Sequence, residues 1–69
     1  MKLEEYRTIL SWSQAELARQ AGINSSSVGK AERGDVISAR VARSICNALS
    51  TALGRQILAR DIDGLKVNV

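Results

Sequence analysis

Hydrophobic positions recur at helical spacing in several consecutive segments of the chain. In the first, Leu3, Tyr6 and Leu10 share one face, which predicts a helix over about residues 3–10. The same reasoning predicts helices over about 14–21, 25–32 and 39–53, the last with a broad apolar band. A short fifth helix is expected at 59–62, before Gly64. The pattern predicts an all-α bundle of about five short helices.

Polar residues mark the ends of the second helix. Ser13 is a good N-cap, and Glu16 stands three residues later, where its carboxylate can bind the cap's own amide. Trp12 and Leu17 occupy the two positions of a hydrophobic staple around this cap. Gly22 then gives the backbone the freedom to end the helix and turn.

The third helix follows directly after this turn. Asn24 is its expected N-cap and Gly34 its end, with Val28 and Ala31 pointing inward. Two short capped helices joined by a glycine turn make a helix-turn-helix over residues 13–34. Ser38 is the expected cap of the fourth helix.

Two connecting segments have weaker patterns. Residues 35–37 are expected to form a loop. The tail, residues 65–69, alternates apolar and polar residues, which fits either a short strand pairing across a dimer or a frayed end.

Length and composition restrict the class of protein. At 69 residues, 45% hydrophobic and 25% charged, the chain is one globular domain, 1–69, without room for a separate catalytic domain. A domain of this size has a small core, and self-association is one remedy. Tyr6 and Trp12 are the only aromatic residues, which argues against a single-strand nucleic-acid binder.

Basic residues are concentrated in the middle of the chain. The net charge is +3, yet the stretch from Arg19 to Arg60 has seven basic residues and only two acidic ones, Glu32 and Asp35. Such a stretch favours a phosphate-facing surface, and the alternative is an ordinary solvated basic face.

Other residue types argue against enzymes, metal sites and membranes. The sequence has no His, no metal-ligand cluster and no paired acids beside a plausible base, so neither an enzyme nor a metal or other cofactor is expected. Cys46 is the single cysteine and is interpreted as a small buried hydrophobe of a reducing compartment. No apolar run is long enough to span a membrane, so we expect a cytoplasmic protein.

The segment from Leu3 to Leu53 resembles the helix-turn-helix of the Cro and lambda-repressor type, the XRE family. The resemblance is densest from Trp12 to Gly34. It rests on the S-Q-x-E-L-A opening at residues 13–18 and the E-R-G ending at 32–34. The positions that fix this structure are Ser13, Glu16, Ala18, Gly22, Val28 and Gly34.

The resemblance also implies an ion pair and shows two departures. Arg7 falls where several members carry an arginine that pairs with the glutamate matching Glu32. Asp35-Val36-Ile37-Ser38 replaces the usual proline-bearing loop, and the fourth helix is longer than usual. Both departures lie away from the third helix.

In such a module the third helix enters the major groove and the second lies across the phosphate backbone. The expected base contacts are Ser25, Ser26 and Lys30, the lysine donating to guanine. Gly29 is expected to face outward and let a thymine methyl approach. Phosphate contacts are expected from Gln14, Arg33, Arg40 and Arg43.

The resulting hypothesis is a sequence-specific double-stranded DNA-binding transcriptional regulator, a repressor. One alternative is the antitoxin of a toxin–antitoxin operon, and another is a protein-interaction adaptor that does not read DNA. Because one module reads few base pairs, a homodimer is expected, with residues 54–69 as its candidate dimerisation tail.

Overall fold

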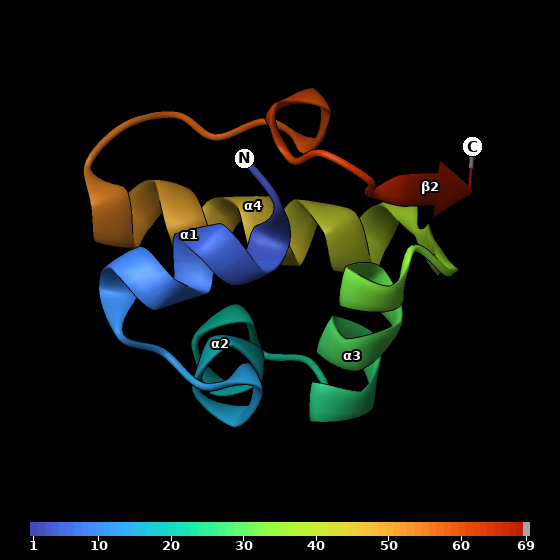
Figure 1. Ribbon diagram of the computed structural model, residues 1–69, viewed down its shortest axis with the longest axis horizontal. Helices are drawn as coiled ribbons and strands as arrows, with labels where there is room; N and C mark the ends of the chain where they lie inside the picture. The colour runs from blue at the N-terminus through green and yellow to red at the C-terminus, as the bar shows by residue number, and fades with distance from the viewer. Residues whose placement is uncertain (69) are drawn as a thin grey trace.

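The computed structural model describes residues 1–68 of the chain, and Figure 1 shows its course. Four α-helices, one 3₁₀ turn and two short strands follow one another along the sequence. In order they are α1 (Leu3–Leu10), α2 (Gln14–Ala21), α3 (Ser25–Arg33), β1 (Val36–Ser38), α4 (Ala39–Leu53), the 3₁₀ turn η1 (Ala59–Asp61) and β2 (Lys66–Asn68).

The long helix α4 separates two parts of the molecule. In Figure 1, α2 and α3 lie on one side of α4, and the chain after α4 returns along the other side. The helices α2 and α3 pack against each other, and α2 also packs against α4. This arrangement supports the helix-turn-helix from behind and leaves one side of α3 uncovered.

One hydrophobic core joins all these elements. Its fully buried side chains come from α2, α3, α4 and the C-terminal segment: Leu17, Val28, Ile45, Leu49 and Ile57. Burial of such side chains removes apolar surface from water and is the main force holding the helices together. The inward positions Val28 and Ala31 and the buried Cys46 agree with the sequence expectation.

The caps of α2 and α4 are confirmed. The hydroxyl oxygen of Ser13 accepts a hydrogen bond from the Glu16 amide at 3.0 Å, and that of Ser38 accepts from the Val41 amide at 3.1 Å. Gly22 ends α2 with a φ of 72°, a conformation that glycine adopts without steric cost.

Two details of the expected caps are wrong. The Glu16 carboxylate does not bind back to Ser13, because it accepts hydrogen bonds from Arg19 and Gln20 in the following turn. Asn24 occupies the N-cap position of α3, but its side chain makes no capping hydrogen bond. The backbone carbonyl of Asn24 accepts instead, from the Ser27 amide.

The expected fifth helix is also wrong. The segment 59–62 contains only the 3₁₀ turn η1, and Ile62 already has extended backbone. Ile57 and Ile62 are both buried, so both ends of this short segment are packed against the core. Only a tight turn, closed by a hydrogen bond from the Leu58 amide to the Asp61 carboxylate, fits between them.

Residues 36–38 form a strand rather than the expected loop. In β1, Val36, Ile37 and Ser38 pair with Lys66, Val67 and Asn68 of β2 in parallel register. The tail therefore pairs within its own chain as far as Asn68, and neither expectation for it, pairing across a dimer or fraying, is correct there. Val69 lies outside the described residues. The buried Ile37 anchors this two-stranded sheet to the core.

Candidate nucleic-acid interface

Helix α3 has one buried and one exposed side. Val28 and Ala31 enter the core, whereas Ser25, Ser26 and Lys30 are exposed. These three exposed residues are the candidate base contacts, and the helix presents them together because they lie at its N-terminal end and one turn further on. The exposed side is thus short, polar and positively charged, which suits hydrogen bonding to base edges.

The candidate phosphate contacts come from the end of α3 and from the elements that flank it in the sequence. The Arg33 side chain is 64% exposed and makes a loose ion pair with Asp35 at 3.4 Å. Arg40 and Arg43 are exposed on the first turns of α4 and have no ion-pair partner among residues 1–68. Neither α3 nor α4 has an acidic residue in its first turn. The positive ends of both helix dipoles are therefore not neutralised locally.

Gln14 makes a contact that the sequence did not indicate. It is the first residue of α2, and its side-chain Nε2 donates to Glu32 Oε1 at 3.0 Å. Glu32 lies near the end of α3, so this bond joins the start of one helix to the end of the other. The candidate phosphate contact on α2 is thus attached to α3.

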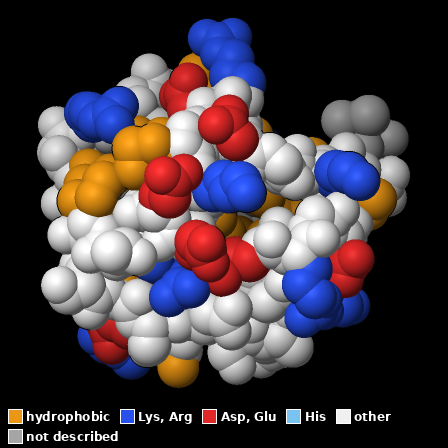
Figure 2. Space-filling view, in the orientation of Figure 1, with side chains coloured by type: hydrophobic (Ala, Val, Ile, Leu, Met, Phe, Trp, Pro, Cys, Tyr) orange, Lys and Arg blue, Asp and Glu red, His pale blue; other side chains and the backbone are white. Residues whose placement is uncertain are grey.

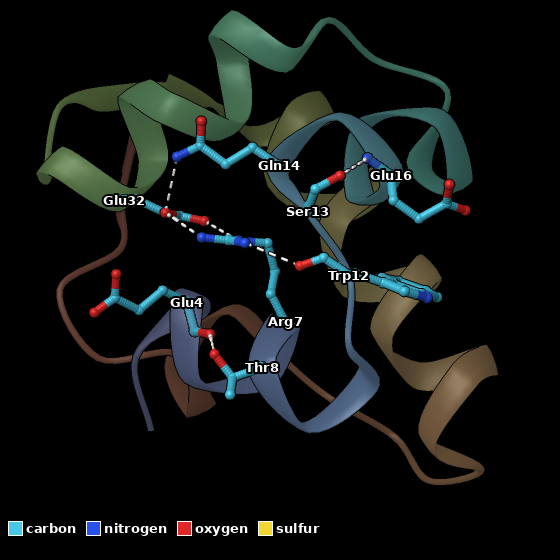
Figure 3. A network of polar contacts seen from close by, with 8 residues as sticks. All are labelled: Glu4, Arg7, Thr8, Trp12, Ser13, Gln14, Glu16 and Glu32. Carbon is cyan, nitrogen blue, oxygen red and sulfur yellow. Dashed lines mark hydrogen bonds and ion pairs between the residues drawn. The ribbon is translucent and has the colours of Figure 1, made fainter.

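Glu32 also pairs with Arg7, as Figure 3 shows. Arg7 Nε and Nη2 donate to the two oxygens of the Glu32 carboxylate at 2.5 and 3.0 Å, and Arg7 Nη1 donates to the Trp12 carbonyl at 2.9 Å. Only 17% of the Arg7 side chain and 11% of the Glu32 side chain is exposed. The network fastens α1, the α1–α2 connection, α2 and α3 together.

The network changes the acidity of both groups. Burial alone would raise the pKa of the Glu32 carboxyl, but hydrogen bonds from Arg7 and Gln14 outweigh it, and the pKa lies below its usual value. The hydrogen bond from the guanidinium to Glu32 raises the pKa of Arg7. Glu32 therefore stays ionised near neutral pH and holds both of its donors.

The expectation for Gly29 is wrong. This residue is buried rather than facing outward. A β-carbon at this position would lie 3.3 Å from Arg33 Nη1 and 3.9 Å from Gln14 Oε1. The first distance is tighter than an ordinary contact and the second is not, so Gly29 leaves space for the Arg33 guanidinium rather than for a base. A glycine within a predicted helix, where it lowers stability, was the available signal of such a close approach.

Comparison with known proteins places this arrangement in a family. The helix-turn-helix family model matches residues 3–55, which include α1 to α4. The chain belongs to the helix-turn-helix family. It is of the XRE type, and this membership makes it a DNA-binding transcription regulator of a family that is generally not enzymatic. No curated protein and no solved structure matches the chain significantly.

Charge is unevenly distributed over this helix-turn-helix protein. On the face shown in Figure 2, acidic side chains gather near the centre, around α1, and basic side chains surround them, including a group over α3. Glu4 and Glu5 lie in the first turn of α1. Carboxylates on this face repel phosphate groups, so α1 is unsuited to face the DNA backbone.

Among residues 1–68, no helix is long and apolar enough to cross a membrane.

Proposed function

We propose that this protein is a sequence-specific repressor that reads double-stranded DNA in the major groove. In this proposal Ser25, Ser26 and Lys30 contact base edges. The observation that carries the proposal is the exposed side of α3, which is small, polar and basic although the rest of the helix is packed. A protein-interaction adaptor would be expected to expose apolar side chains there.

The proposed phosphate contacts are Gln14, Arg33, Arg40 and Arg43. They come from the start of α2, the end of α3 and the start of α4. The exposure of all four side chains supports this role, and for Arg40 and Arg43 so does the start of α4, which has no acidic residue in its first turn.

We further propose that the protein binds its operator as a homodimer. One module contacts only a few base pairs, and a two-fold operator places the half-sites about 34 Å apart. The proposed interface lies on α4 and the C-terminal segment, residues 54–69. The part of that segment that the structure describes lies across α4 from α2 and α3 (Figure 1) and leaves the reading helix free. Val36, 61% exposed beside β2, supplies apolar surface near this region.

Selection from random duplexes, followed by a salt titration, tests the proposal. We expect an enriched motif with two half-sites and an affinity that falls steeply as salt rises. Binding without an enriched motif would leave only nonspecific DNA association. Absence of binding even at low salt would reject DNA reading altogether. Sedimentation of the free protein and of the complex reports the dimer separately.

A further inference from the structure

Glu32 accepts hydrogen bonds from side chains of two different helices. Arg7 of α1 occupies both carboxylate oxygens, and Gln14 of α2 adds a bond to Oε1. Arg7 alone would explain a structural ion pair between α1 and α3. The Gln14 bond is additional, and it engages a side chain at the margin of the reading surface.

We infer that Glu32 is a positioning residue for DNA binding, which fixes the Gln14 amide relative to the reading helix. The inference rests on the proposed function, because it assigns to Gln14 a phosphate contact. What it adds is a physical connection between that contact and α3. The phosphate held at the start of α2 and the bases read by α3 would then be kept at a set distance.

The hydrogen bond determines which way the Gln14 amide points. Nε2 faces Glu32 at 3.0 Å, and Oε1 lies toward Gly29, 3.9 Å from where a β-carbon would be. The amide nitrogen carries two hydrogens, and the bond to Glu32 uses one. The second hydrogen and the backbone N–H groups of Gln14 and Ala15 remain for a phosphate, because the Glu16 amide already donates to Ser13.

Fixing this side chain before DNA arrives lowers the cost of binding. A free glutamine loses several rotamers when it contacts a ligand, and a side chain already held loses fewer. Gly29 leaves space for the Arg33 guanidinium, and the Gln14 amide lies at an ordinary contact distance from the same position. The same carboxylate that joins α1 to α3 thus also prepares the DNA contact.

The free protein offers the first test, by NMR of the side-chain amides during an acid titration. Protonation of Glu32 weakens its acceptor oxygen, so the Gln14 amide signals are expected to shift with the same midpoint as the Glu32 carboxyl carbon. The carboxyl signal of Glu4, the other carboxylate acting on Arg7, is assigned separately so that its titration is not confused with that of Glu32. Gln20, bonded to Glu16, is expected to follow that residue instead. Gln56, which has no side-chain hydrogen bond within residues 1–68, serves as the control amide. If the Gln14 amide signals change with pH only as those of Gln56 do, the inference is overturned.

The second test is a mutant cycle in DNA binding. The double variant Arg7→Met/Glu32→Met replaces the ion pair with apolar side chains of similar size, an exchange that proteins often tolerate. We expect Gln14→Ala to weaken binding about fivefold in the natural protein, as loss of one hydrogen bond does. In the double variant, which itself binds several-fold more weakly, Gln14→Ala is expected to have almost no further effect.

The outcomes separate the positioning role from a structural one. Circular dichroism first establishes that each variant is folded at the assay temperature. If the double variant binds like the natural protein, or if Gln14→Ala costs the same in both backgrounds, Glu32 does not position Gln14. If the natural protein binds no DNA, the proposed function fails, and the NMR titration still decides whether Glu32 holds Gln14. If the double variant does not fold, Gln14 amide signals that do not titrate with Glu32 still overturn the inference.

Discussion

In the helix-turn-helix, most of the residues that begin and end each helix act through neighbours a few positions away in the sequence. The C-terminal segment 55–68 instead depends on partners that are distant in the sequence. Ser13 caps α2 through the amide three residues later, and Gly22 ends the same helix. The segment 55–68 is held by β1, by the Ser50 hydroxyl and by the Tyr6 hydroxyl, which donates to the Asp61 carbonyl. The helix-turn-helix therefore has strong local sequence signals, and the C-terminal segment has almost none.

The difference indicates how each region responds to change. Local signals and tertiary contacts act together in α2 and α3, so a core substitution there should weaken the whole domain. The C-terminal segment makes few regular hydrogen bonds and contributes three-residue elements. Such segments open at lower free energy than core helices. The helix-turn-helix should therefore survive changes that release the tail.

The largest expected effect comes from Leu17→Ala. Leu17 is fully buried between α2 and its neighbours, and truncation leaves a cavity, so we expect a loss of about 3 kcal/mol in the free energy of unfolding. Urea denaturation followed by circular dichroism measures it. The control is Ile9→Ala, at a side chain 59% exposed, expected within about 0.5 kcal/mol of the natural protein. Equal effects of the two would contradict the core described above.

Removal of Glu32 should come next. Glu32→Ala leaves the largely buried Arg7 with the Trp12 carbonyl as its remaining acceptor, and we expect a cost of about 2 kcal/mol at neutral pH. The pKa of Glu32 is lowered in the folded state, so its contribution is complete above the ordinary glutamate pKa of the unfolded chain and is lost as pH falls through the folded pKa. Urea midpoints between pH 7 and pH 3 should show this loss. Glu32→Gln should reduce the fall in urea midpoint between pH 7 and pH 3, and it should do so more than Glu16→Gln does. Equal reductions in the two variants would argue against the network.

Much of the helical fold could be predicted because its signals are local. The bounds of α1, α2 and α4 match the expected ranges, and α3 extends one residue further, to Arg33. The parallel pairing of β1 with β2 joins segments about thirty residues apart, and three residues carry too little pattern to indicate it. The 3₁₀ turn has only one apolar residue, Ala59, so the pattern of residues 59–62 is too short to distinguish it from a helix.

The candidate site was predictable in its residue types and less so in its contacts. Exposure of Ser25, Ser26 and Lys30 follows from the helical period of α3. The bond between Gln14 and Glu32 depends on the crossing of two helices, which spacing does not give. The burial of Gly29 depends on the side chains of Gln14 and Arg33, and it was missed for the same reason.

A smaller effect is expected from Ser50→Ala. The Ser50 hydroxyl donates to the Cys46 carbonyl at 2.7 Å and accepts from the Ile57 amide at 2.8 Å. Its loss should cost about 1 kcal/mol, since the Ile57 amide loses its partner. Hydrogen exchange at Ile57 should speed up while Leu17 stays protected. Thr51→Ala, at the exposed neighbouring position, is the control. Uniform acceleration across all helices would show that the two regions open together.

The central claim, that α3 reads bases while flanking arginines hold phosphates, is tested most directly by comparing Lys30→Ala with Arg43→Ala. Affinities are measured for a selected operator and for each of its single-base variants, over a range of salt concentrations. Lys30→Ala should lose about 1–3 kcal/mol and its preference at one base pair. Arg43→Ala should weaken all sequences alike and reduce the salt slope by about 1. Indistinguishable profiles for the two variants would contradict this division of roles.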